Sequence, residues 1–489
     1  MHAAFPRLLL TAILASALAA CGQGGEEALD VTVIGKEAPR IADPADRPLT
    51  EPGAVLLMSA AQGLVRFDGR GQIEPGLAER WNVSDDGLSY IFRIGARDWP
   101  DGRAITARDV ARILNRQRRT ASRNALKDTL GAVSEIVAMT DRVLEIRLRA
   151  PRPNLLQLLA QPEFAIVREG QGTGPFTIDA KQDAPGAIAL THVVRIVDDK
   201  DRIEHAHLRN AEAAQAIARF GEGKSELVLG GTFADLPLVP RRDRAMRNAL
   251  RFDPVAGLFG LMPARGGGPL ADAQLRGLLN RAIDRDALIA ALDVPNLHAR
   301  TTLLQSGLEG GANPVPPAWA AVPMPERHAQ AASEARQAMG EGRVTLAIAL
   351  PEGRGGDLVL ARLAADWRPL GIDLVRAGKG VPADLKLVDQ VAPSSSPAWF
   401  VRSFRCGVAP QCSEPADALM DSARDAQIGA QRAAMLAEAG RILDSDNLFM
   451  PIAAPVRWSL VGDLPGFSEN IFARHPLSGL RDKPARERQ

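Results

Sequence analysis

Two cysteines in the C-terminal fifth of the chain form its clearest chemical pair. Cys406 and Cys412 stand six positions apart, with Gly407 and Pro410 between them. In an oxidising compartment this spacing predicts a small-loop disulfide, worth about 2 kcal/mol from loop entropy. A redox or metal pair is the alternative, but no histidine flanks the cysteines and the spacing is not Cys-x-x-Cys.

Catalytic patterns are weak by comparison. His205 and His207 have the spacing of two ligands on one face of a strand, although a lone His-x-His is mostly incidental. The sequence has no Gly-x-Ser-x-Gly turn of the kind that presents a nucleophilic serine. We therefore expect neither an enzyme nor a metal site or cofactor.

Composition places the chain among soluble globular proteins. The 489 residues include 59 Lys and Arg and 58 Asp and Glu, so the net charge of +1 gives no field that would attract nucleic acid. Hydrophobic residues make up 46%, and at this length two or more domains are expected. Aromatic residues make up only 4%, which argues against a pocket lined with many rings.

The N-terminus has the pattern of an export signal. Arg7 precedes an apolar run from Leu8 to Ala20, about half the ~20 residues that a membrane span needs. The run ends Leu18-Ala19-Ala20-Cys21-Gly22, which resembles the lipobox of bacterial lipoproteins, with Cys21 as the lipid acceptor. The alternative is an ordinary secretory signal with a chance cysteine.

Residues 62–110 give the most informative element pattern. Two strands, at 81–84 and 88–94, flank Asp85-Asp86-Gly87, and the Asp-Gly pair suits a tight hairpin turn. Thr106 and Asp109 form a capping box, which predicts the start of a helix over 106–126. Elsewhere the patterns predict strands at 31–34, 55–58, 143–148, 226–230, 252–262 and 344–350, and helices at 154–159, 212–220, 270–289 (in two pieces, the second capped by Asp284), 358–370 and 431–443.

This ordered set resembles the signature of the family 5 extracellular solute-binding proteins, the oligopeptide-, dipeptide- and nickel-type receptors of ABC importers. The resemblance rests mainly on 62–110 and on 270–289, which contains Ala282-Ile283-Asp284-Arg285. The turn Gly172-Thr173-Gly174-Pro175-Phe176 supports it. The matches run in order from about residue 55 to residue 467.

The resemblance implies an α/β fold of the two-lobed periplasmic-binding-protein type (type II, the large cluster with an extra subdomain), with mixed sheets. It implies two hinge crossings, near residues 251–253 and 450–455. The expected domains are a signal peptide at 1–20, a lobe I core at 21–58, 165–251 and 452–489, an extra subdomain of lobe I at 59–164, and lobe II at 252–451.

The resemblance also implies a function. The expected protein is a lipid-anchored periplasmic monomer that delivers a peptide or peptide-like solute to an ABC permease and ATPase by hinge closure, with inner or outer membrane left open. A lipoprotein of the same fold that acts as a scaffold or sensor partner is the alternative. The candidate ligand contacts are Gln62, where the family often has Glu, Trp399, Phe400, Arg405 and Glu414, the acid nearest to a position where peptide-binding members carry Asp.

Overall fold

The computed structural model describes residues 28–179, 185–195, 201–311, 313–340, 342–378 and 380–482. The expected signal peptide, Cys21 and the end of the charged tail lie outside the described residues. Within the described ranges, no helix is long and apolar enough to cross a membrane.

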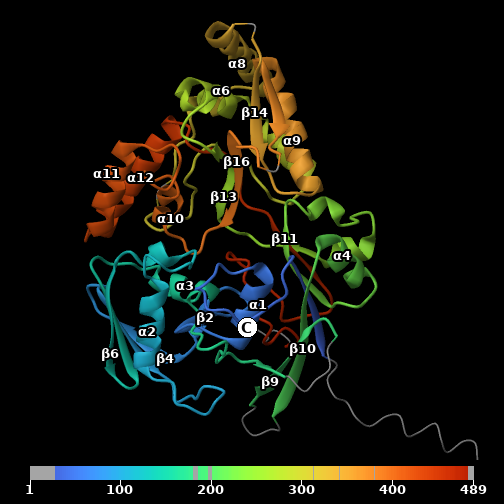
Figure 1. Cartoon of the computed structure of the whole chain (residues 1–489). Coiled ribbons are helices and arrows are strands. Elements are labelled where there is room, and N and C mark those ends of the chain that lie inside the picture. The colour runs from blue at the N-terminus through green and yellow to red at the C-terminus, as the bar shows by residue number, and fades with distance from the viewer. Residues whose placement is uncertain are drawn as a thin grey trace, which may run out of the picture.

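A seven-stranded mixed sheet forms the core of the first lobe (Figure 1). In sheet order its strands are β12 (Leu250–Phe252), β18 (Arg457–Val461), β11 (Leu227–Thr232), β1 (Leu29–Ile34), β10 (Arg202–Ala211), β9 (Ile188–Val194) and β8 (Thr177–Ile178). Strand β1 lies parallel to β10 and β11, and the other pairs are antiparallel. Helices α1 (Glu51–Ala60), α4 (Ala213–Gly221) and α5 (Arg244–Ala249) belong to this lobe.

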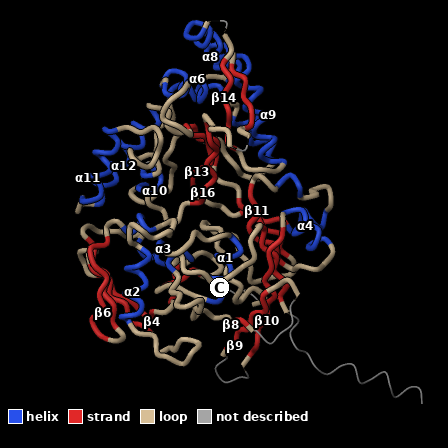
Figure 2. The backbone as a smooth tube through the Cα atoms, viewed as in Figure 1, coloured by secondary structure: helices blue, strands red, loops and turns tan. Residues whose placement is uncertain are grey.

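A four-stranded antiparallel sheet forms a separate layer beside the first (Figure 2). Its strands are β4 (Ala78–Val83), β5 (Ser89–Ile94), β7 (Val143–Leu148) and β6 (Val133–Thr140), and helix α2 (Ala107–Gln117) packs against β6 and β7. The short pair β2 (Val65–Phe67) and β3 (Ile73–Pro75) and helix α3 (Leu155–Leu159) connect this layer to the rest of the lobe. Its own hydrophobic core contains Tyr90, Phe92 and Trp99, so this layer is packed as a unit.

The second lobe contains a five-stranded mixed sheet. In sheet order its strands are β15 (Ile372–Arg376), β14 (Val344–Ala349), β16 (Leu385–Val391), β13 (Gly257–Pro263) and β17 (Met450–Ala453). Its helices are α6 (Ala273–Ala282), α7 (Arg285–Leu292), α8 (Met324–Met339), α9 (Arg354–Trp367), α10 (Pro397–Arg402), α11 (Glu414–Asp425) and α12 (Gly429–Ser445). The last three helices form a layer that faces the four-stranded sheet across the lobe boundary (Figure 1).

The chain passes between the two large sheets twice. Strand β12 leads into β13 through residues 253–256, and β17 leads into β18 through residues 454–456. These crossings adjoin the positions expected from the sequence. Beside them, Arg457 of one sheet donates to Asp389 of the other (Nη1 to Oδ1, 2.8 Å), and both side chains are largely buried. An ion pair therefore joins the lobes at the hinge.

The helix-capping residues predicted from the sequence are confirmed. The Thr106 hydroxyl accepts a hydrogen bond from the amide of Asp109 (3.2 Å), and α2 begins there as predicted. Asp284 likewise accepts from the amide of Ala287 (3.0 Å), so the helical block divides at the expected capping residue. Side-chain oxygens satisfy amides that the first helical turn leaves without partners.

Two expected elements were wrong. The strand predicted at 55–58 is part of helix α1, because Thr50 caps the amide of Gly53 and Pro52 stands in the first turn, where it is tolerated. The helix predicted over 106–126 ends at Gln117, and a separate 3₁₀ turn follows at Lys127–Leu130.

The turn at 172–176 is explained by close packing on α1. A Cβ added at Gly174 would lie 2.4 Å from the carbonyl oxygen of Ser59, which is closer than carbon and oxygen can approach. Phe176 donates its amide to the same carbonyl (3.0 Å) and its ring is buried. Glycine at 174 thus lets the turn lie directly against the end of the helix.

Candidate functional site

A cavity of about 930 Å³ lies between the lobes. Its volume is at the upper end of the range of about 300 to 1,000 Å³ that is usual for small-molecule sites. One wall comes from the four-stranded layer and the segment after it, and the other from the C-terminal helices of the second lobe. A solute in this cavity would therefore touch both lobes.

The first-lobe wall is built on the end of β7 and the start of α3. Arg152 lies in the loop between them, and the Tyr90 hydroxyl donates to the Arg152 carbonyl (2.9 Å), which holds the loop against the sheet. Leu155 and Leu158 supply apolar lining from α3, and both are buried. The loop and helix thus place a cation beside an apolar surface.

The second-lobe wall is built on α10, α11 and α12. Trp399 lines the cavity, whereas its neighbour Phe400 is fully buried in the core of the lobe. The two rings meet edge to face, with centroids 5.0 Å apart. Arg432, on α12, is buried and donates to Ser396 (Nη2 to Oγ, 3.2 Å). Helical packing thus fixes which side chains reach the cavity.

Hydrogen bonds join the two walls directly next to the cavity. Asn154 donates to the hydroxyl of Ser394 (2.9 Å), and Gln161 donates to the carbonyl of Pro393 (2.9 Å). The amide of Ser395 donates to a side-chain oxygen of Gln157 (3.0 Å). The lobes are therefore in contact in this structure.

Burial in the cavity walls lowers the pKa of three arginines that line the cavity. Burial, and secondarily the nearby charge of Arg432, lowers the pKa of Arg152 to about 10. Burial also lowers the pKa of Arg432, which Glu309 opposes, and the pKa of Arg402, which Asp128 opposes. With a pKa of about 10, Arg152 still carries its charge at neutral pH.

The structure separates the candidate ligand contacts named from the sequence. Trp399 and Arg405 line the cavity. Gln62 is buried elsewhere and donates its side-chain amide to the carbonyl of Thr173, next to the 172–176 turn. Phe400 is in the core, and Glu414 is exposed at the first position of α11, apart from the lining residues. The ligand contacts themselves stay predictions.

Several lining residues escaped sequence reasoning. Arg152 and Arg432 line the same cavity from opposite lobes although they are far apart in the chain, and neither belongs to a motif. The available signal was the abundance of arginine, which is spread over the whole sequence. It could not indicate which arginines converge.

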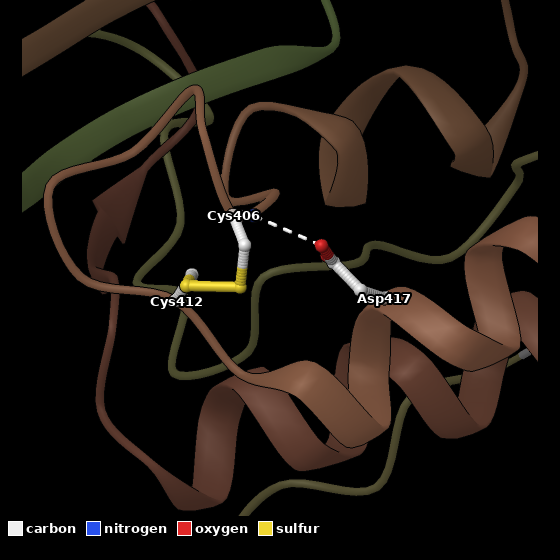
Figure 3. The surroundings of a disulfide bond; sticks show 3 residues. All are labelled: Cys406, Cys412 and Asp417. Carbon is white, nitrogen blue, oxygen red and sulfur yellow. Dashed lines mark hydrogen bonds between the residues drawn. A yellow bond between two sulfur atoms is a disulfide. The ribbon is translucent and has the colours of Figure 1, made fainter.

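In the structure Cys406 and Cys412 form a disulfide, with their Cα atoms 5.0 Å apart (Figure 3). Gly407 has a φ of +83°, a backbone conformation that favours glycine, and so closes the turn between them. The amide of Cys406 donates to Asp417 on α11 (3.0 Å). This loop carries Arg405 and Val408 into the cavity wall, so the disulfide fixes part of the site.

Metal-ligand clustering is not seen among the described residues, where no group of three or more His, Cys, Asp and Glu could hold an ion. His205 and His207 lie on β10, where His205 contacts the hydroxyl of Thr191 (3.3 Å) and His207 lies 3.8 Å from Asp30.

Comparisons with known proteins agree with this architecture. Residues 72–376 match the family model described as bacterial extracellular solute-binding proteins, family 5 Middle. The probable di/tripeptide-binding protein 5 of Pseudomonas aeruginosa (strain UCBPP-PA14) is 23% identical over 543 aligned residues, covering 98% of both chains. The probable deoxycholate-binding periplasmic protein YgiS of Escherichia coli (strain K12) is 34% identical over 129 residues, which cover 22% of this chain and 24% of that protein.

Solved structures share the fold at low sequence identity. Haemophilus influenzae OppA, in complex with RPPGFSPFR, has a TM-score of 0.78 at 18% identity and covers 93% of this chain and 98% of its own. The Escherichia coli murein tripeptide binding protein MppA has a TM-score of 0.77 at 17% identity and covers 92% and 97%. The fold is thus that of two-lobed periplasmic binding proteins, as expected. Because the family model spans well over half of its length, this chain belongs to family 5 of the bacterial extracellular solute-binding proteins.

Proposed function

We propose that this chain captures a short peptide or peptide-like solute between its lobes and delivers it to an ABC importer. The observation that carries the proposal is the cavity of about 930 Å³ lined from both lobes. Relatives named for di/tripeptides and for a murein tripeptide, and a solved relative with a bound peptide, support the peptide class.

Capture works through hinge closure. A solute that touches both walls binds the closed form better than the open form, because an open hinge withdraws one wall. That difference in affinity shifts the population toward the closed form, and a ligand with equal affinity for both would shift nothing. The crossings at 253–256 and 454–456 are the segments where the backbone would bend.

The domain division follows from the same hinge. We assign 21–58, 165–251 and 452–489 to the lobe I core, 59–164 to its extra subdomain and 252–451 to lobe II, with 1–20 as a signal peptide. Among the candidate contacts, Trp399 and Arg405 have the support of their position in the cavity wall. Gln62, Phe400 and Glu414 would act on the solute only after a rearrangement.

The chain works at a membrane surface, as a monomer, facing the periplasm. Its anchor is a lipid on Cys21, the cysteine of the lipobox-like sequence. Each buried acyl methylene contributes about 0.8 kcal/mol, so several acyl chains together hold a protein at a bilayer. The Cys406–Cys412 disulfide suits the same oxidising compartment. The membrane-bound permease and ATPase are its partners.

An uptake assay in the native host tests the proposed role. A strain that lacks this chain is expected to lose uptake of a labelled mixture of di- and tripeptides. Uptake should return with the wild-type chain and with Arg343→Ala, which alters an exposed ion pair with Asp373. Unchanged uptake in the deletion strain would contradict delivery to an importer and would favour the scaffold or sensor role.

A further inference from the structure

The walls of the inter-lobe cavity carry a marked excess of positive charge. Eight cationic side chains line it, four from each lobe, against one lining carboxylate, Asp128. The cations are Arg118, Lys127, Arg149 and Arg152 from the first lobe and Arg402, Arg405, Arg424 and Arg432 from the second. Because the whole chain has a net charge of only +1, this excess is local to the cavity.

Second-lobe cations are paired with the protein's own carboxylates. Arg405 and Arg424 share Asp421, each with a distance of 2.8 Å. Arg402 meets Asp128 of the other lobe at 3.2 Å, and Arg432 meets Glu309 at 3.2 Å. Three carboxylates thus form ion pairs with the four cations of this wall, which leaves one positive charge in excess.

First-lobe cations have carbonyl partners instead. Arg118 donates to Val133, and Lys127 donates to Thr120 and Ser122. Arg149 and Arg152 also donate to backbone carbonyls, of Gly131 and of Pro151 and Arg424 respectively. Among the described residues, none of these four lining cations forms an ion pair with a carboxylate. Carbonyls satisfy their N–H groups but leave their charge unbalanced.

Positive charges meet across the lobe boundary. Burial lowers the pKa of Arg152, and the charges of Arg432 and Arg149 lower it further, whereas Glu309 and Asp425 raise it. Both side chains are at least half-buried, where charges interact more strongly than in water. Because Glu309 is paired with Arg432, the charge that stays unbalanced here is that of Arg152, and an anion beside it in the cavity would offset that charge while also lying near Arg432.

We propose that the solute is a multiply charged anion of peptide size, with an acidic short peptide as its representative, held between Arg152 of the first lobe and Arg432 of the second. This rests on the proposed function and specifies its substrate class. Guanidinium groups suit carboxylates because their planar N–H pairs match the two carboxylate oxygens. Only the closed form brings both cations to the same anion, so the charge of the solute also drives closure.

Isothermal titration of the purified full-length chain at low salt tests the charge. The probes are three tripeptides of matched length, Ala-Glu-Glu, Ala-Gln-Gln and Ala-Lys-Lys, together with inorganic pyrophosphate. Ala-Glu-Glu is expected to bind at least about tenfold more tightly than Ala-Gln-Gln, and Ala-Lys-Lys weakest. Added salt should weaken the binding of Ala-Glu-Glu more than that of Ala-Gln-Gln.

Variants locate the effect. Arg152→Gln is expected to weaken Ala-Glu-Glu binding about tenfold more than Ala-Gln-Gln binding, whereas Arg152→Lys keeps the charge but not the paired N–H groups and should fall between wild type and Arg152→Gln. Arg343→Gln, at an exposed ion pair outside the cavity, is the matched control and should change neither. An unchanged melting temperature would show that Arg152→Gln is folded.

Each outcome bears on a different claim. Equal or tighter binding of Ala-Gln-Gln or Ala-Lys-Lys would overturn the anionic class and leave peptide capture standing. Binding of pyrophosphate without Ala-Glu-Glu would support an anion site and count against a peptide solute. If no anionic probe binds, the inference fails, while delivery to an importer is decided separately by the uptake assay.

Discussion

Replacing Arg457 with alanine is expected to lower the free energy of unfolding by about 3 to 5 kcal/mol. Arg457 donates to both carboxylate oxygens of Asp389, at 2.8 and 3.0 Å, and to the Asp389 carbonyl at 3.2 Å. Side-chain exposure is 18% for Arg457 and 14% for Asp389, so the variant leaves a buried carboxylate without its partner. The loss falls at the hinge, where the pair joins the two sheets.

The effect of Arg457→Ala should depend on pH. Burial raises the pKa of Asp389, and Arg457 opposes that rise, so removing Arg457 raises the pKa further. The folded variant then holds a proton that the unfolded chain releases above its ordinary pKa near 4. Its stability therefore falls as pH increases from about 4 toward the raised pKa, and the deficit should be smallest in acid.

Urea unfolding at pH 4.5 and pH 8 measures both effects. Arg343→Ala is the control, because the Arg343–Asp373 pair is exposed (48% and 42%) and should contribute little to stability. Equal losses in the two variants, or a deficit that grows in acid, would contradict the buried hinge pair.

Replacing Cys21 with serine is expected to move the protein from the membrane fraction to the soluble periplasm. Without the thiol the proposed lipid cannot be attached, and with it goes the apolar contact that would hold the chain at a bilayer. Fractionation of host cells that express the two forms measures the shift, with Cys412→Ser as a control that keeps the proposed anchor.

The same cells report on the compartment. Cys406 and Cys412 of the wild type should resist alkylation until a reductant is added, because they are expected to be oxidised after export. Retention of the Cys21→Ser form in the membrane fraction would contradict the lipid anchor, and two freely alkylated thiols would contradict the disulfide.

Local chemistry made much of the fold predictable from the sequence. Thr106 and Asp284 cap helices through contacts within three residues, so their effects can be inferred without the rest of the chain. The strand predicted at 55–58 was wrong because a run of four apolar residues is equally consistent with a strand and with a buried helix. The residues that indicate a helix, Thr50 and Pro52, precede this run.

The binding site was less predictable because it is assembled from distant segments. Arg152 and Arg432 come to line one cavity only after the lobes fold and come together. Gln62 was a candidate contact because of its place in a motif, yet its amide is bound to Thr173, more than a hundred residues away. Trp399 and Arg405, which line the cavity, are candidates because they lie just upstream of the segment in which peptide-binding members of the family carry Asp.

Native mass spectrometry of the protein purified from its own host tests solute capture most directly. We predict an added mass that is released on denaturation and belongs to an acidic, peptide-sized compound. Ala398 lines the cavity, so Ala398→Trp should narrow it and reduce the added mass while the protein stays folded. Bare wild-type protein, with no thermal shift across a library of short peptides, would contradict capture of a peptide between the lobes.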